Sequence, residues 1–327
     1  MAKYFVTGAT GFIGGELVKQ LVGRGHKVVA LVRSPDKAAI LKALGVEIHA
    51  GDITDRETLK TPMTGVDGVF HVAAWYKVGV KDPSADQINV DGTRNVLQTM
   101  QALEIPRGVY TSTVAVFSDT HGVMRDETYR YDGPHLSEYD RTKWIAHYRV
   151  ALPKIEGGLP LTIVMPGVVY GPGDTSGMRT ALVDMLRGRL SMTPAKTAFC
   201  WAHIEDTARA HILAMEKGQP GETYIIAGPR HTFEYAFDLA AEIAKVRPPV
   251  AHPGRRAMRG TAAIMSIAER IVTLPPAFTP EALRVLAGTT YLGSNAKAVR
   301  ELGFTPRSIA EGMVQTLEHE LRLLGRT

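Results

Sequence analysis

The stretch Thr7-Gly8-Ala9-Thr10-Gly11-Phe12-Ile13-Gly14 decides the fold. The apolar residues 4–6 before it have the pattern of a strand, and residues 11–23 have the pattern of a helix. Glycine lacks a Cβ, so it permits a tight turn and lets backbone N–H groups approach a pyrophosphate at the helix N-terminus. We therefore expect Gly8, Gly11 and Gly14 to form the phosphate-binding loop of a dinucleotide site.

Strand-like runs alternate with helical patterns through the first two-thirds of the chain. This alternation predicts an α/β fold, a Rossmann-type doubly wound parallel sheet with helices on both faces. We expect an NAD(P)-binding domain at 1–165, to which segments near 195–227 return. Residues 166–327 should form a smaller, mostly helical substrate domain, because prolines and helical patterns dominate there. The expected strands are 4–6, 27–32, 46–49, 69–72, 108–111, 161–164 and 224–227.

The composition is that of an ordinary globular protein. The chain has 327 residues, of which 45% are hydrophobic and 22% charged. Its one cysteine, Cys200, excludes an intrachain disulfide and fits a reducing compartment. The sequence shows no signal peptide and no apolar run long enough to span a bilayer, so we expect a cytoplasmic protein.

The net charge of +5 is concentrated near the C-terminus, where residues 241–327 hold 12 Lys and Arg against 7 Asp and Glu. Arg255, Arg256 and Arg259 stand beside the apolar run 262–271. This segment is typical of a solvated helix face. Contact with an anionic substrate, a membrane surface or a partner is the alternative. No interleaving of aromatic and basic residues points to nucleic-acid binding.

The end of the second expected strand indicates which nucleotide binds. NAD sites usually place an acidic residue there to hold the adenosine ribose. This chain has Val32, Arg33 and Ser34 instead. Because a cation suits a 2′-phosphate, we expect NADP(H) to be preferred and NAD(H) to be possible. The alternative is that Arg33 stacks on the adenine without discriminating.

Two further strand ends are expected to contact the cofactor. Asp52 after the third strand could accept a hydrogen bond from the adenine amino group, with Ile53 packed on the ring. A simple Asp-capped turn is the alternative. Ala73 and Ala74 follow the fourth strand, where small side chains would let the backbone pass close to the cofactor.

Tyr139 and Lys143 are four residues apart in the run Ser137-Glu138-Tyr139-Asp140-Arg141-Thr142-Lys143. On a helix this spacing places both side chains on one face. A free tyrosine has a pKa of ~10, and a nearby ammonium and an oxidised nicotinamide would lower it. Tyr139 could then exchange a proton with a carbonyl or alcohol oxygen.

In order and spacing, these segments resemble the extended short-chain dehydrogenases/reductases over nearly the whole chain. Within that superfamily the chain is most similar to the dihydroflavonol-4-reductase-like branch. That branch also includes cinnamoyl-CoA reductases, 3β-hydroxysteroid dehydrogenases and sugar epimerases of hopanoid gene clusters. The matching segments are Thr7–Gly14, Gly51–Asp55, His71–Ala74, Asn89–Leu97, Tyr110–Thr113, Tyr139–Lys143 and Pro166–Gly173.

The resemblance implies roles for further residues. Thr113 aligns with the family's catalytic serine, with Ser112 as the neighbouring candidate, and Asn89 aligns with a mostly structural asparagine. His203 and Asp206 fit a helix start better than a site. The family also commonly forms homodimers through two helices of each subunit, one of which would include residues 144–149. The implied cofactor contacts are Gly8, Thr10, Gly11, Phe12, Ile13, Arg33, Asp52, Ile53, Ala73, Ala74, Thr111, Tyr139, Lys143, Pro166 and Val169, and no metal is implied. Trp75, Tyr76 and Tyr170 could line an apolar substrate pocket; the alternative is that they belong to the core, as aromatic residues after strands often do.

Departures from the family pattern narrow the reaction. Val114 and Ala115 replace the acidic pair of sugar dehydratases. Phe199 stands where nucleotide-sugar epimerases have an arginine for the diphosphate, and residues 286–291 lack a second one, although Arg179, Arg187 or Arg189 could compensate. We therefore expect an NADPH-dependent reductase, with Thr113, Tyr139 and Lys143 catalytic, for an apolar ketone or aldehyde.

Three alternatives to that reading stay open. The first is an epimerase or isomerase that oxidises its substrate transiently. The second is a redox sensor or scaffold without catalysis. Such proteins commonly lack the tyrosine or the lysine, and this chain has both. The third is a membrane-associated variant of the reductase that uses residues 255–271.

Overall fold

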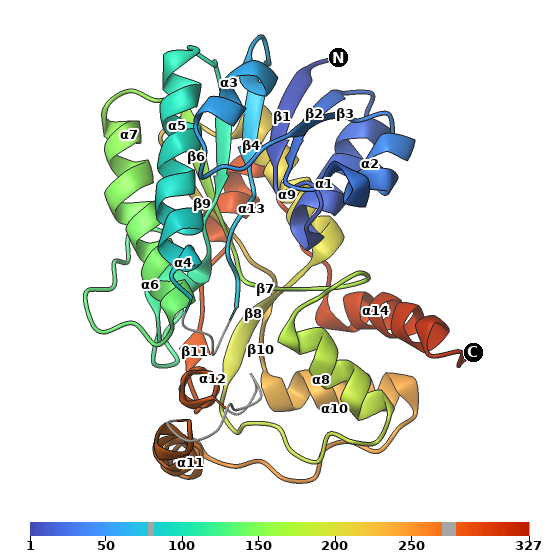
Figure 1. Cartoon of the computed structure of the whole chain (residues 1–327). Coiled ribbons are helices and arrows are strands. Elements are labelled where there is room, and N and C mark those ends of the chain that lie inside the picture. The colour runs from blue at the N-terminus through green and yellow to red at the C-terminus, as the bar shows by residue number, and fades with distance from the viewer. Residues whose placement is uncertain (78–81, 270–278, 327) are drawn as a thin grey trace.

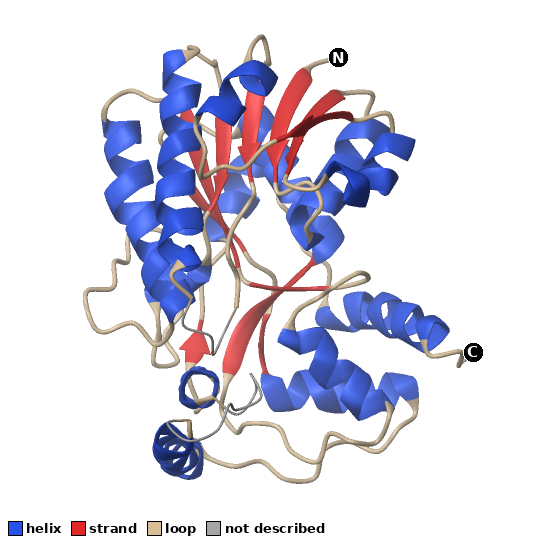
Figure 2. Cartoon of the chain, viewed as in Figure 1, coloured by secondary structure: helices blue, strands red, loops and turns tan. Residues whose placement is uncertain are grey.

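The structure of the protein is a computed structural model, and the residues that it describes are 1–77, 82–269 and 279–326. Its centre is a parallel seven-stranded sheet with the order β3-β2-β1-β4-β5-β6-β9 (Figures 1 and 2). The doubly wound sheet expected from the sequence is thereby confirmed, and each expected strand is found to within two residues at each end. The strands are β1 (Lys3–Thr7), β2 (Lys27–Val32), β3 (Glu47–Ala50), β4 (Gly68–His71), β5 (Gly108–Thr111), β6 (Leu161–Pro166) and β9 (Thr223–Ile226).

Helices cover both faces of the sheet, because its central strands are apolar on both sides. One face packs against α1 (Phe12–Gly23), α2 (Ala39–Ala43), α9 (Ile204–Lys217) and α13 (Ala296–Leu302). The other packs against α3 (Glu57–Met63), α5 (Thr93–Ala102), α6 (Glu138–Ile145) and α7 (Leu152–Glu156). A π-helical turn precedes α5 (η2, Gln87–Gly92) and another joins α6 to α7 (η4, Ala146–Ala151). Short helical turns complete this half: η1 (Pro35–Ala38), α4 (Ser84–Asp86) and η3 (Val114–Phe117).

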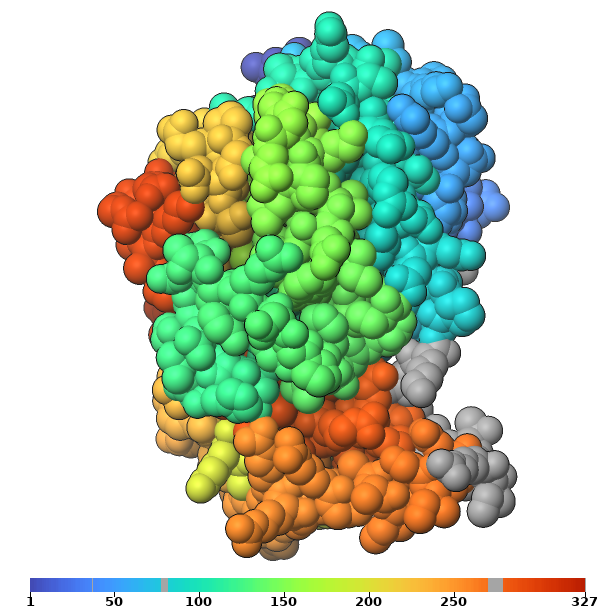
Figure 3. Space-filling view, turned by 90° about the vertical axis from the view of Figure 1, so that its left-hand side faces the viewer, coloured from blue at the N-terminus to red at the C-terminus, as the bar shows by residue number. Residues whose placement is uncertain are grey.

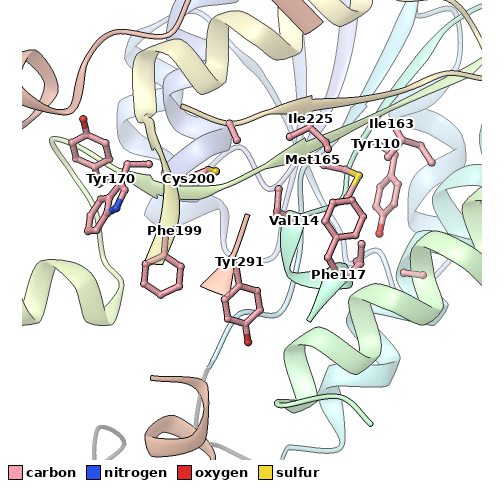
Figure 4. Close-up of a cluster of buried hydrophobic side chains, with 14 of the residues drawn as sticks. Tyr110, Val114, Phe117, Ile163, Met165, Tyr170, Phe199, Cys200, Ile225 and Tyr291 are labelled. Carbon is pink, nitrogen blue, oxygen red and sulfur yellow. The ribbon is translucent and has the colours of Figure 1, made fainter. Parts of the chain in front are cut away.

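A second, smaller sheet was not expected from the sequence. In it β8 (Ala198–His203) lies between β10 (Arg230–Thr232) and β11 (Thr290–Tyr291), and β7 (Val168–Tyr170) also pairs with β8. Of the segments near 195–227, β9 joins the large sheet whereas β8 belongs to the small one. Figure 4 shows side chains from both sheets in one buried cluster, which therefore connects the two halves of the molecule.

Helices dominate the rest of the C-terminal part, as the sequence indicated. α8 (Gly177–Leu186) and α14 (Ile309–Leu323) pack on α10 (Phe233–Ala244), and α11 (Arg255–Ala268) packs on α12 (Pro280–Val285). Apolar residues of α11 and α12 form a small core of their own. None of the helices in the described part of the chain is long and apolar enough to cross a membrane.

The division at residues 165 and 166 and the homodimer stay predictions. Residues 144–149, expected on one of the two dimer helices, run from the end of α6 into η4, on the face of the molecule that is turned to the viewer in Figure 3. This face contains a hollow of about 380 Å³ whose lining includes the basic residues Arg94, Arg149 and Lys154. Like charges on both copies would oppose close association of this face with itself.

Candidate active site

The glycine loop lies between β1 and α1 and against the end of β4. Gly8 has a φ of 73°, in the left-handed region that favours glycine, and a Cβ there would lie 2.7 Å from the backbone nitrogen of Ala73. A Cβ on Gly14 would collide with the carbonyl of Gly8. α1 begins after Gly11 without a side-chain cap and without an acidic residue in its first turn, so its first N–H groups are available to donate hydrogen bonds to an anion. Thr10 and Gly11 are exposed, and Phe12 and Ile13 are half-buried.

Arg33 lies at the end of β2 beside the glycine loop. A pocket of about 320 Å³ is lined by Thr10, Val32, Arg33 and Ser34 and has no acidic residue in its lining. Arg33 is exposed, and the described residues give its guanidinium no ion-pair partner. The donors and the charge of this pocket fit a phosphate group.

Asp52 forms the capped turn that the sequence left open as an alternative. Its Oδ1 accepts hydrogen bonds from the backbone N–H and the hydroxyl of Thr54, both at 2.9 Å. Ile53 is buried, and its side chain occupies the space where a Cβ on Gly92 would lie. The turn therefore holds Ile53 in place, and a contact between Asp52 and adenine stays a prediction.

The chain after β4 is tied to its neighbours by buried side chains. Thr7 Oγ1 accepts from the N–H of Ala73 at 3.1 Å, which fixes the backbone next to the glycine loop, and Ala74 is exposed. Asn89 accepts from the N–H of Trp75 at 2.8 Å and donates to Thr142 Oγ1 at 2.9 Å. Asn89 thus has a structural role, since it joins this segment to the helix that carries Tyr139 and Lys143.

Tyr139 lies in the first turn of α6, where Ser137 caps the helix. The structure brings Thr113 to Tyr139, and a hydrogen bond between their side chains lowers the pKa of the phenol. Ser112 points elsewhere, since its hydroxyl lies 2.8 Å from His147 Nδ1. The ring of Tyr76 stands edge-on to that of Tyr139, with 4.8 Å between the centroids. Thr113, Tyr139 and Tyr76 therefore converge, as the sequence suggested.

The lowering of the Tyr139 pKa that was expected from the Lys143 ammonium is not found. Burial raises the pKa of Tyr139, and the hydrogen bond from Thr113 offsets only part of that rise. The reason lies partly in Lys143, whose Nζ donates to Tyr110 Oη at 3.0 Å and to the Thr111 carbonyl at 2.7 Å. Burial also lowers the pKa of Lys143 to about 7, so this amine is not fully charged at neutral pH.

The remaining predicted residues follow β6. Pro166 is its last residue and is buried, and Val169 is half-buried on β7, paired with Ala202 of β8. Tyr170 is not brought to Tyr139. It lies in the core of Figure 4, with its ring edge-on to Trp201 at a centroid distance of 5.7 Å. The prediction that Tyr170 lines the substrate pocket is therefore not supported by its placement.

Two residues that sequence reasoning missed also lie at this site. Asp140 is buried directly after Tyr139, and its Oδ2 accepts a hydrogen bond from Tyr291 Oη at 3.0 Å. Asp140 stands inside the run that identified Tyr139, but nothing in the sequence indicated its partner.

His203 and Asp206 have the structural roles expected of them: His203 caps α9, and Asp206 binds Arg307 at 3.0 Å.

Within residues 1–77, 82–269 and 279–326, no group of three or more His, Cys, Asp or Glu could hold a metal ion.

The comparison with protein families agrees with a nicotinamide-cofactor site. The model of the NAD dependent epimerase/dehydratase family matches residues 4–227. The chain belongs to this family. The resemblance to extended short-chain dehydrogenases/reductases is thereby confirmed, as is the prediction of an NAD(P)-dependent oxidoreductase acting on CH–OH groups.

Individual relatives cover nearly the whole chain. The chain is 32% identical to sterol demethylase protein B of Methylococcus capsulatus over 93% of each protein. It is 33% identical to a 2-alkyl-3-oxoalkanoate reductase of Stenotrophomonas maltophilia over 95% of this chain and 97% of that protein. The crystal structure of gox2253 superimposes over 100% of both chains with a TM-score of 0.86 and 31% identity.

Proposed function

We propose that the protein is an NADPH-dependent reductase that interconverts a ketone or aldehyde and an alcohol, with Tyr139 as the general acid and base. The observation that most supports this function is the hydrogen bond between the side chains of Thr113 and Tyr139, because Tyr139 lies on the same helix as Lys143. When bound, the nicotinamide cofactor would supply the hydride. Tyr139 would pass its proton to the carbonyl oxygen, and the Thr113 hydroxyl would donate a hydrogen bond to the same oxygen.

The raised pKa of Tyr139 suits this direction of reaction. A general acid must carry its proton when the substrate arrives, and burial keeps this phenol protonated at neutral pH. Lys143, below it on the same face of α6, would hold the nicotinamide ribose. Contact with that ribose requires its amine to reach beyond the Thr111 carbonyl, to which it donates at 2.7 Å.

We also propose a preference for NADPH over NADH. The pocket lined by Arg33, Thr10 and Ser34 offers a cation and two hydroxyls to a 2′-phosphate, and its lining has no carboxylate for a ribose diol. Glycines and the uncapped start of α1 would hold the pyrophosphate.

The substrate should be neutral and largely apolar. Among the arginines that could replace the missing diphosphate contacts, Arg179 is bound to Glu320 at 2.8 Å and Arg189 to Asp184 at 2.8 Å. Besides burial, the nearby carboxyl groups of Asp174 and Asp140 raise the pKa of Tyr76, and their negative charge would oppose binding of a diphosphate there. The names of two relatives, a sterol demethylase protein and an alkyl-oxoalkanoate reductase, favour an apolar ketone. We propose that Tyr76 and Trp75 contribute to its binding.

The test is oxidation of NADPH and NADH by wild type, Tyr139→Phe and Tyr224→Phe with aryl ketones, 3-oxo acids and steroid ketones. Tyr224 is a matched control, because it is a buried tyrosine on β9 whose hydroxyl bonds to the backbone N–H of Gln219 and to the side chain of Glu301, neither of which belongs to the proposed site. Loss of the proton donor should reduce kcat by roughly 100- to 10,000-fold in Tyr139→Phe, whereas Tyr224→Phe should retain turnover. Wild type that retains bound cofactor but consumes none with any ketone would instead indicate an epimerase.

A further inference from the structure

A buried carboxylate beside Tyr139 takes no part in the reaction proposed above. Asp140 is 3% exposed and follows Tyr139 directly on α6. Its Oδ1 accepts a hydrogen bond from Ser137 Oγ at 2.7 Å, and its backbone N–H donates to the same hydroxyl at 3.1 Å. Asp140 and Ser137 thus close the N-terminal turn of the helix on which Tyr139 stands.

The second oxygen of Asp140 connects this turn to the small sheet. Tyr291 Oη donates to Oδ2 at 3.0 Å, although the two residues are 151 positions apart in the sequence. Tyr291 is itself held firmly, because its ring stacks on Phe199 of β8 with 5.9 Å between the centroids. The preceding residue, Thr290, donates its N–H to the buried carboxylate of Asp119 at 3.0 Å. β11 therefore meets two buried carboxylates of the N-terminal half, one of them next to Tyr139.

We propose that Asp140 is a positioning residue that, through Tyr291, couples the small sheet to the helix carrying Tyr139 and Lys143, and that this coupling depends on the ionisation of Asp140. This inference rests on the proposed function, since it assigns Tyr139 and Lys143 to the reaction. Ionised Asp140 can accept from Ser137 and Tyr291 together. In protonated Asp140 one of the two oxygens carries a hydrogen and acts as a donor. The hydroxyl of Ser137 or of Tyr291 that faces this oxygen must then turn to accept, so one of the two hydrogen bonds rearranges.

The surroundings of Asp140 place this change near neutral pH. Burial and, to a smaller extent, the carboxylate of Glu281 from α12 raise the pKa of Asp140, which lies at about 7 when all its contacts are included. The hydrogen bonds from Ser137 and Tyr291 act in the opposite direction. The other titratable neighbours are the phenols of Tyr76 and Tyr139, which stay neutral in this range. On the outer side of α6, Arg141 is neutralised by Glu138 and Asp86.

The test measures NADPH affinity by fluorescence, and kcat/KM where a ketone is turned over, from pH 5.5 to 9. The proteins are wild type, Tyr291→Phe, Asp140→Asn and the control Tyr224→Phe. Tyr291→Phe removes a hydrogen bond to the charged form, so the ionisation of Asp140 should move up by roughly one to two pH units. Asp140→Asn should abolish that step. Lys143 also titrates near pH 7, but its step should stay in place in all four proteins.

Each result decides the question. A step that moves in Tyr291→Phe and disappears in Asp140→Asn supports the coupling. Superimposed profiles for wild type and Tyr291→Phe overturn it, even if Asp140→Asn fails to fold. A change in the pH dependence of Tm alone, with unchanged NADPH affinity and kcat/KM, would make Asp140 a purely structural carboxyl. Absence of ketone turnover by wild type counts against the proposed reductase, while the NADPH affinity profile still tests the coupling.

Discussion

At the scale of single residues, the proposed preference for NADPH rests on Arg33. Its guanidinium lines the pocket at the end of β2 and has no ion-pair partner among the described residues. We expect Arg33→Ala to weaken NADPH binding by about 1.5 to 3 kcal/mol, the range of a hydrogen bond to a charged group, and to leave NADH binding nearly unchanged. Fluorescence titration with both cofactors checks this. Arg24→Ala is the control, because Arg24 is an exposed arginine at the other end of α1. Equal weakening of both cofactors would contradict discrimination by Arg33.

Lys143 should make the stability of the protein depend on pH. The folded-state pKa of about 7 lies below the unfolded value of 10.5, so above pH 7 the unfolded chain binds more protons than the folded one. Stability therefore rises with pH from about 7, by about 1.4 kcal/mol per pH unit until the unfolded value is reached. Lys143→Met lacks this gain. Chemical denaturation without cofactor at pH 6.5 and 9 gives the free energy of unfolding of both proteins. The difference between wild type and variant should shift in favour of wild type at pH 9, and a constant difference would mean that Lys143 is charged when buried.

Much of the site could be predicted at this scale, for reasons that particular residues show. Tyr139 and Lys143 are four positions apart on one helix, so local spacing was sufficient to place them on one face. Thr113 was assigned to the site by its alignment with the family's serine. Tyr291 could not be found in this way, because its bond to Asp140 spans 151 positions and depends on how the small sheet packs. The lack of an effect of Lys143 on the Tyr139 pKa could not be predicted for a similar reason, since burial and the partners of Lys143 are tertiary properties.

At the scale of elements, the large sheet was predictable and the small one was not. Strands such as β2 and β6 are continuous apolar runs bounded by turn residues, which the sequence shows directly. β10 and β11 have three and two residues, and they are strands only because β8 pairs with them. Their short length leaves no periodic pattern to detect.

The packing of α14 against β7 gives a prediction at the same scale. A Cβ on Gly312 of α14 would collide with the hydroxyl of Tyr170, which is buried and cannot move aside. We expect Gly312→Ala to destabilise the protein by about 1 to 3 kcal/mol through overpacking. Tyr170→Phe, which removes the hydroxyl, should restore part of that loss in the double variant, because Tyr170 Cζ and His203 Cδ2 would still lie 2.9 Å from the added Cβ. Denaturant unfolding of the two single variants and the double variant measures this coupling.

A matched control is available on α11. A Cβ on Gly260 would meet no atom within 4 Å, so Gly260→Ala should stabilise the protein by roughly 0.5 to 1 kcal/mol through helix propensity alone. Additive effects of Gly312→Ala and Tyr170→Phe would show that α14 shifts away from β7 to accommodate the methyl group.

At the scale of the whole molecule, the buried cluster of Figure 4 predicts that both sheets unfold together. Met165 and Ile225 of the large sheet share this cluster with Phe199 and Tyr291 of the small one. Phe199 is 6% exposed, and Phe199→Ala should cost about 3 to 5 kcal/mol through lost burial and the cavity left behind. Because the core is continuous, calorimetry should show one transition in wild type and one transition at lower temperature in the variant. Two resolved transitions, of which only one moves, would mean that the small sheet and its helices unfold independently of the cofactor-binding half. The coupling through Tyr291 and Asp140 would then have to act across a boundary that opens on its own.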